Sequence, residues 1–313
     1  MGKLPYYKTL QEKAGFFFKG SKRVNTKKEF DRFWERLRDL DGKGIYRFRG
    51  CSEAKYKLYT SAQRYWNERE IKKQRIKYHE FIQRLIAHSM QWNHETVQRF
   101  FAQNNINLNN ALAYLSYMQH YGMPTPLLDF TTNPYSGLYF AVKNPIFAPS
   151  DRDIDSYCSL YIVSTVNPFF ADSISQFDRD IAVQPDGAIE YERHLLSHSI
   201  LFVSTGNSAY KILNNLNILN QEGVFFFSSN AEMPIEAAYK EAMLDFQNSL
   251  GADLFAQYGY QEFFAECINF HKSLRPYILA KLKTENITSD FLFPDIEKFS
   301  ESVLSLVLSE HRD

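Results

Sequence analysis

The sequence predicts an α+β fold in which a mixed β-sheet forms the core and helical embellishments surround it. Short strand-like segments are separated irregularly by helical ones, unlike the regular alternation of a doubly wound sheet. Of the 313 residues, 44% are hydrophobic and 16% are aromatic, which is enough to bury a substantial core. The chain has no internal repeat, low-complexity tract or linker rich in proline and glycine, so one main domain is expected.

The N-terminal segment, residues 1–44, is expected to be a helical extension. Thr26 and Glu29 have the spacing of a capping box, in which each side chain bonds the backbone of the other residue. Apolar residues then recur at helical spacing on one face, namely Phe30, Phe33, Trp34, Leu37 and Leu40. The turn at 41–44, which contains two glycines, is expected to end this helix.

The first core strand is expected at residues 45–49, where the side chains alternate as a strand requires. Gly50 interrupts the alternation and is expected to end the strand. Arg49 is therefore placed at a strand end. The region from about 68 to 120 has helical periodicity.

The rest of the chain alternates short strands and helices without a regular order. A short apolar strand is expected at 127–132, and Pro134 suits the first turn of a helix that continues over 135–142. Further strands are expected at 159–163, 200–203, 224–227 and 263–270. Further helices are expected at 189–197, 208–219, 235–249 and 274–284.

Cysteine use and hydropathy favour a cytoplasmic protein. Cys51, Cys158 and Cys267 form neither a C-x-x-C pair nor a cluster with histidine at zinc-ligand spacing. No metal site is therefore expected, and a reducing compartment is favoured. No run of about 18 apolar residues occurs, and the N-terminal residues lack the apolar core of a signal peptide, so no membrane association is expected.

Charge is balanced over the whole chain but not locally. Lysine and arginine together number 36, as do aspartate and glutamate, so the chain as a whole lacks the electrostatic footprint of a nucleic-acid-binding protein. Residues 55–84 nevertheless carry nine basic residues against three acidic ones. This stretch is either a solvated helix face or a surface for RNA or an acidic partner.

Four separated motifs give the sequence a resemblance to the FRG domain family. They are Phe48-Arg49-Gly50, QHYGMPTPLLDFTTNP at 119–134, QEGVF at 221–225, and Phe293-Pro294-Asp295. The resemblance implies an FRG domain over residues 45–297, followed by a C-terminal helix at 298–313. Pro126 and Phe130 depart from the family pattern, which has arginine and tryptophan there. Because its neighbours are apolar, Phe130 is still expected to be a buried aromatic residue.

The order of these motifs is similar to the R-S-E pattern of ADP-ribosyltransferases, which implies an ADP-ribosyltransferase-like sheet and NAD as substrate. Arg49, beside Asp129, would grip the NAD phosphates through its planar guanidinium. Gly50 would let the backbone approach the nicotinamide amide without a Cβ in the way. Thr131 and Thr132 would take the place of the Ser-Thr-Ser step and fix the strand that shapes the pocket.

The same resemblance implies a catalytic carboxylate near the ribose. Cleavage of the N-glycosidic bond passes through an oxocarbenium-like state, which a carboxylate stabilises. Glu222 is the candidate, because it directly precedes the apolar run 223–227. Gln221 is a candidate contact to the ribose or the acceptor, and His120 is a further catalytic candidate.

Each candidate also has a structural interpretation. Arg49 is also suited to bond strand carbonyls or Asp129, because a partly buried guanidinium needs partners. Glu222 is equally suited to be an ordinary residue of the turn before the strand. The two threonines suit a helix entry, and His120 suits a structural hydrogen bond at a helix end.

The function expected from these residues is NAD-dependent transfer of ADP-ribose onto a macromolecule, RNA or protein. Such an activity suits a toxin in a bacterial toxin–antitoxin or phage-defence system, with an antitoxin as neutralising partner. Two alternatives are an NAD glycohydrolase and a non-enzymatic module in which Arg49, His120 and Asp129 bind a nucleotide or a partner. Motifs of Rossmann dehydrogenases, P-loop enzymes, zincins and α/β-hydrolases are absent from the sequence.

Overall fold

The computed structural model describes residues 4–17, 19–69, 71, 75–91, 94–108, 110–147, 149–164, 201–203, 216–257 and 266–294. The helices expected at 189–197 and 298–313, Asp295, and most of the helix expected at 208–219 lie outside these ranges. Among the described residues, no helix combines the length and the hydrophobicity that a membrane crossing needs.

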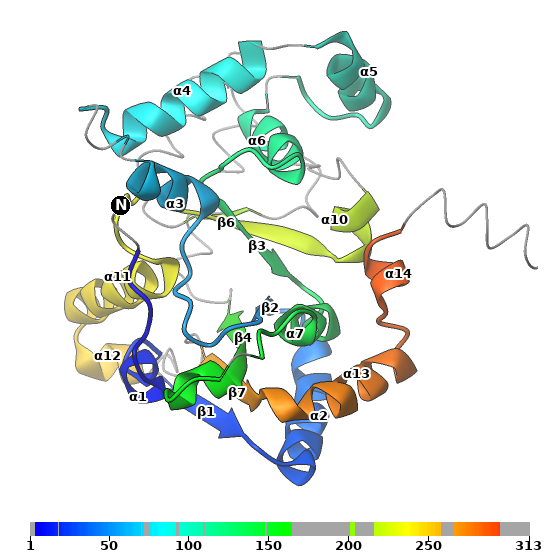
Figure 1. Cartoon of the computed structure of the whole chain (residues 1–313). Coiled ribbons are helices and arrows are strands. Elements are labelled where there is room, and N and C mark those ends of the chain that lie inside the picture. The colour runs from blue at the N-terminus through cyan, green and yellow to red at the C-terminus, as the bar shows by residue number, and fades with distance from the viewer. Residues whose placement is uncertain are drawn as a thin grey trace, which may run out of the picture.

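The core is a seven-stranded sheet with the strand order β1-β7-β4-β2-β3-β6-β5 (Figure 1). Its strands are β1 (Ser21–Val24), β2 (Tyr46–Cys51), β3 (Leu127–Thr131), β4 (Tyr157–Ser164), β5 (Leu201–Val203), β6 (Gly223–Phe227) and β7 (Glu266–His271). β1 pairs parallel with β7, whereas the other neighbouring strands pair antiparallel. The sheet is therefore mixed, and the predicted α+β fold class is confirmed.

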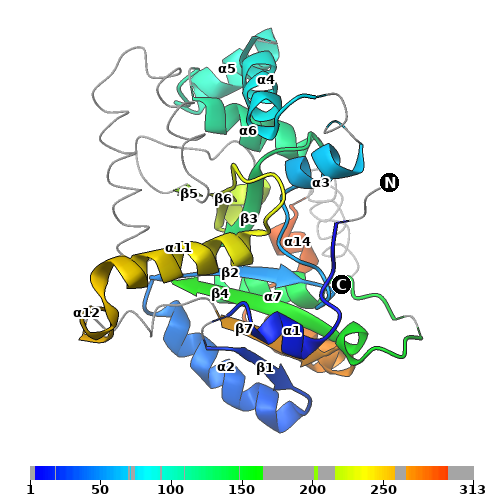
Figure 2. The same ribbon diagram turned by 90° about the vertical axis from the view of Figure 1, so that its left-hand side faces the viewer.

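Helices cover the sheet on both faces and at one end. They are α1 (Leu10–Ala14), α2 (Lys27–Asp41), α3 (Ser61–Glu68), α4 (Tyr78–Gln91), α5 (Glu95–Gln103), α6 (Ala111–His120), α7 (Pro134–Val142), α10 (Leu216–Asn220), α11 (Ile235–Leu250), α12 (Ala252–Gln257), α13 (Arg275–Thr284) and α14 (Ser289–Leu292). Helices α2, α7 and α13 share one apolar core with β2, β4 and β7. Helix α11 packs on the other face, and Figure 2 shows α11 and α2 on opposite sides of β2 and β4. Helices α3, α4 and α6 pack against β3 and β6.

The N-terminal segment is more than a helical extension, because β1 supplies an edge strand of the core sheet. Helix α2 within it forms as the sequence predicts. The hydroxyl of Thr26 accepts from the Glu29 amide, and the Glu29 carboxylate accepts from the Thr26 amide, so the capping box is present. The apolar face of this helix is buried against β7 through Phe30, Phe33 and Phe270. Local capping and periodicity were sufficient to predict this helix.

The sheet consists of two well-paired halves that meet at one register pair. β2 pairs with β4 along its whole length, and β3 pairs with β6 along its whole length. Between β2 and β3 the register contains only Phe48 opposite Thr131. Beyond this pair the strands diverge, and in Figure 2 β3 and β6 run in a different direction from β2 and β4. The divergence leaves an opening in the sheet beside Arg49.

Gly50 lies within β2 rather than ending it, since it pairs with Leu160 of β4. A Cβ at Gly50 would overlap the backbone of Gly137 and Ala141 in α7. A Cβ at Gly137 would in turn lie 2.7 Å from the Cβ of Phe48. The two glycines let α7 pack directly on β2. Gly50 is therefore required by helix–strand packing, which a local reading of the sequence does not detect.

Candidate functional site

The opening between β2 and β3 forms a cleft of about 340 Å³. This volume lies within the range of small-molecule sites. Polar residues from four places along the chain line it: Arg49 and Ser52; Asp129 and Thr131; Lys143 and Asn144; and Gln221. Apolar walls are supplied by Phe48, Phe130, Phe140, Ile218, Val224 and Phe225. Phe130 is buried and packs on Phe226 with ring centroids 4.3 Å apart, so its expected place in the core is confirmed.

Arg49 reaches across the opening from β2 to β3. Its Nη1 donates to the backbone carbonyl of Asp129 and lies 4.0 Å from the Asp129 carboxylate. Its Nε is buried and has no hydrogen-bond partner among the described residues. Burial lowers the pKa of Arg49, but a guanidinium stays charged in proteins, so this side chain brings a cation with spare donor capacity to the cleft.

Asp129 is held from the other side by Gln119, whose Nε2 donates to Oδ1 at 2.7 Å. Gln119 Oε1 in turn accepts from the hydroxyl of Thr125. Enclosure by protein raises the pKa of Asp129 while the nearby Arg49 opposes this effect, although water still reaches 64% of the side chain. Sequence reasoning did not include Gln119 in the site, and its place at the start of the 119–134 motif was the available signal.

Thr131 joins the end of β3 to the turn before β6. Its hydroxyl donates to the carbonyl of Gln221 at 2.5 Å and accepts from the amide of Asn133 at 2.9 Å. Its side chain is buried, so both bonds are shielded from water. Gln221 lines the cleft, and its Nε2 donates to the carbonyl of Leu292 at 2.9 Å.

Glu222 lies directly before β6, as the sequence predicts, between the cleft-lining residues Gln221 and Gly223. Its carboxylate is fixed by two donors: the hydroxyl of Thr132 at 2.8 Å and Nδ2 of Asn133 at 3.1 Å. Its φ of 49° places it in the left-handed region that is uncommon for residues other than glycine. Glu222 is exposed and is not among the residues that line the cleft. The bonds from Thr132 and Asn133 to Glu222 join the 119–134 motif to the 221–225 motif.

Of the residues near the motifs, His120 lies outside the cleft, whereas Lys143, which no sequence pattern marked, lines it. His120 is the exposed last residue of α6, contacts the ring of Tyr121 and does not line the cleft. Lys143, just after α7, does line it, and its Nζ lies 3.5 Å from the centroid of the Phe293 ring. Burial lowers the pKa of Lys143. No sequence pattern marked Lys143, because its position depends on how α7 packs on β2.

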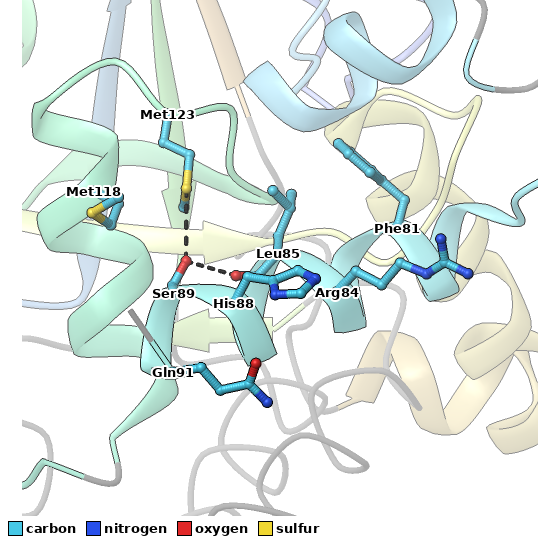
Figure 3. Close-up of a pocket in the computed structure, with 8 residues that line it drawn as sticks. All are labelled: Phe81, Arg84, Leu85, His88, Ser89, Gln91, Met118 and Met123. Carbon is cyan, nitrogen blue, oxygen red and sulfur yellow. Dashed lines mark hydrogen bonds between the residues drawn. The ribbon is translucent and has the colours of Figure 1, made fainter. Parts of the chain in front are cut away.

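A larger hollow of about 630 Å³ lies between α4 and α6 (Figure 3). Its walls include Phe81, Leu85, Met118 and Met123, and the hydroxyl of Ser89 is already bonded to the Leu85 carbonyl and directed at the Met123 sulfur. Within the described part of the chain, no carboxylate lines this hollow. Arg84, His88 and Gln91, all from α4, also line this hollow. The polar groups of the opening in the sheet come instead from four places along the chain and include a carboxylate, so the opening is the better candidate for a site although it is smaller. Among the described residues no cluster of histidine, cysteine and carboxylate side chains could hold a metal ion.

Comparison with known proteins identifies part of the chain. No curated protein and no solved structure gives a significant match. The family model of the FRG domain matches residues 44–148, a range that contains β2, β3 and α7 with Arg49, Asp129 and Lys143. Gln221 and Glu222 lie beyond the matched range, so the expected extent to residue 297 stays a prediction. The chain thus contains an FRG domain at residues 44–148, and this domain supplies most of the cleft.

Proposed function

We propose that the chain binds NAD in the cleft between β2 and β3 and transfers its ADP-ribose to a macromolecule. The observation that carries the proposal is that Arg49, Asp129 and Gln221 line one cleft, with Glu222 standing in the chain between the lining residues Gln221 and Gly223. These residues are up to about 170 positions apart in the chain, and convergence of polar groups in a concave site is the usual sign of a ligand site.

The cationic side chains of the cleft suit the pyrophosphate of a dinucleotide. Arg49 retains an unpartnered Nε, and Lys143 brings a second cation to the same cleft. A planar guanidinium can bind two phosphate oxygens at once, which lysine cannot do. Asp129 and Gln221 offer oxygen and amide groups to ribose hydroxyls. The cleft thus has polar groups that suit the pyrophosphate and a ribose of the ADP-ribose unit.

The reaction breaks the bond between the ribose C1′ and the pyridinium nitrogen of NAD. The bonding electron pair stays on nitrogen, and nicotinamide leaves as a neutral molecule. Positive charge then develops on the ribose, and Glu222 supplies the carboxylate that stabilises it and accepts the proton of the attacking group. A new bond joins C1′ to the acceptor. Thr132 and Asn133 hold Glu222 for this role and would have to release one of its oxygens during the reaction.

One observation favours a second candidate, a module that binds a nucleotide without cleaving it. Both carboxylate oxygens of Glu222 are already bonded, and the side chain does not line the cleft. In that case Glu222 stabilises the turn before β6, and Arg49 and Asp129 bind the ligand in the cleft.

The test uses NAD labelled on its adenylate, incubated with the full chain and a cell extract. We expect nicotinamide release and label on a macromolecule, and Glu222→Gln to lower turnover roughly 100-fold to 1,000-fold. Glu95→Gln is the matched control, because Glu95 is an exposed glutamate of α5 paired with Arg99. Nicotinamide without labelled acceptor would identify a glycohydrolase. Thermal stabilisation by NAD without nicotinamide release would identify the binding module, and absence of both effects would reject the proposal.

The biological setting we propose is a growth-arresting toxin of a toxin–antitoxin or phage-defence system. Induced expression of the wild-type chain in bacteria should stop growth, and Glu222→Gln should relieve the arrest at equal protein level. Equal growth inhibition by both proteins would reject this setting.

A further inference from the structure

Two more cavities continue from the cleft on the far side of the Arg49–Asp129 pair. The second cavity, of about 230 Å³, shares Arg49 and Asp129 with the cleft and is also lined by Tyr59 and Arg64. The third, of about 190 Å³, shares Tyr59 and Arg64 with the second. Shared lining residues therefore place the three cavities next to one another in a row. We call the second and third cavities the Arg64 track.

Two guanidinium groups face the second cavity. Arg64 is exposed on α3, and its guanidinium has no hydrogen bond or ion pair with any described residue. Its charge acts on Arg49, whose pKa is lowered chiefly by burial and further by Arg64. Asp129, the one carboxylate among the described residues that line this cavity, is already bonded to Gln119 and lies near Arg49. Two cations that repel one another across a cavity are a site for an anion.

Aromatic rings lie next to these cations. Tyr6, 45% exposed, and Tyr56 line the third cavity, with ring centroids 5.4 Å apart. Lys57 lines it as well, and Glu68 is the acidic residue there. Alternation of aromatic faces with lysine and arginine is the arrangement by which proteins bind single-stranded nucleic acid, since bases stack on the rings and phosphates meet the cations.

We propose that the Arg64 track binds single-stranded nucleic acid and presents one nucleotide of it to the cleft as the acceptor of ADP-ribose. The role as acceptor rests on the proposed function, whereas the binding does not. Separate rings and cations suit a flexible single strand, whose bases can stack one at a time, better than a stiff duplex. The track also gives a role to part of the basic stretch at 55–84, although the chain as a whole has no net charge.

The first experiment measures binding of a labelled single-stranded oligonucleotide by fluorescence anisotropy, without NAD, over a series of salt concentrations. The affinity should fall with salt, and Arg64→Ala should reduce the slope of log K against log salt by about 0.7, the value for one phosphate contact on a single strand. Arg99→Ala is the matched control, since Arg99 is exposed on α5, pairs with Glu95 and lines neither cavity of the track.

Substitutions at Tyr6 test stacking separately from charge. Tyr6→Ala should weaken binding roughly 5-fold to 100-fold, whereas Tyr6→Phe should retain the wild-type affinity, because stacking needs the ring and not the hydroxyl. The proposal is overturned if Arg64→Ala and Arg99→Ala behave alike, or if duplex or an acidic peptide binds as tightly as the single strand.

Adding adenylate-labelled NAD separates this proposal from the proposed function. Label on the oligonucleotide, reduced in Arg64→Ala, supports both. Oligonucleotide binding that depends on Arg64 but gives no label keeps the track as a binding site, rejects its role in presenting an acceptor and counts against the transferase. Label on protein alone, with no effect of Arg64, rejects the track and leaves the transferase in place.

Discussion

The hydroxyl of Thr131 donates a 2.5 Å hydrogen bond to the carbonyl of Gln221, which lies 90 residues further along the chain. This bond fastens the turn before β6 to the end of β3. Thr131→Val keeps the shape of the side chain but leaves the Gln221 carbonyl and the Asn133 amide without this partner. We expect the free energy of unfolding to fall by about 1–3 kcal/mol in urea denaturation. Thr132→Val, at a more accessible hydroxyl, is the control and should cost less; equal losses would show that burial of Thr131 is unimportant.

Gly50→Ala should be among the most destabilising substitutions of a glycine in this chain. Its Cβ would overlap the backbone of α7, which cannot move aside as a flexible side chain can. We expect a loss at or above the 1–3 kcal/mol typical of overpacking, read from thermal or urea unfolding. Gly42→Ala is the matched control, because its φ is −62° and the nearest atom to a new Cβ is 4.0 Å away. A stable Gly50→Ala variant would contradict the direct packing of α7 on β2.

The ionisation of Asp155 makes part of the free energy of unfolding depend on pH. Burial would raise its pKa, but hydrogen bonds from Ser150, Lys55 and Arg152 outweigh that effect and hold the pKa at about 2. A carboxyl whose pKa is lower in the folded state stabilises the fold above its unfolded pKa, and this contribution is lost as the pH falls from about 4 to about 2.

Asp155→Asn should therefore lower stability at pH 7 by about 1–2 kcal/mol and flatten the decline between those pH values. Urea titrations at several pH values measure both effects. Asp39→Asn, at an exposed residue of α2, should change neither. The assignment fails if Asp155→Asn keeps the full acid dependence of the wild-type chain.

Arg49→Lys tests whether the planar shape of the guanidinium, rather than its positive charge, is needed for binding. Lysine keeps the positive charge but cannot bond the Asp129 carbonyl and a phosphate in the same plane. If the cleft binds NAD, we expect the Michaelis constant for NAD to rise roughly 10-fold to 100-fold, the effect of one lost charge-assisted hydrogen bond, with little change in turnover. Arg99→Lys serves as control. A loss of turnover alone would move Arg49 from binding to the chemical step.

The sequence predicted those features that depend on neighbouring residues. The capping box of α2, the start of α7 at Pro134 and the position of Glu222 before β6 are local, and all three were predicted correctly. Gly50 was assigned to a strand end because its partner surface, α7, begins more than 80 residues later. Lys143 was missed for the same reason, because it enters the site through the packing of α7 on β2. Gln119 was missed although its partner Asp129 is only ten residues away and belongs to the same motif.

The divergence of β2 from β3 has a consequence for how the molecule unfolds. Each half of the sheet is paired along its full strands, but between the halves the register holds one residue pair, helped by Arg49 bonding across. Fewer residue pairs therefore hold β2 to β3 than hold β2 to β4 or β3 to β6. A ligand that contacts Arg49 and Gln221 together would link the two halves of the sheet where they share one register pair. Amide hydrogen exchange in β2 and β3 should therefore slow in concert when the cleft is filled, and unfolding should become more cooperative.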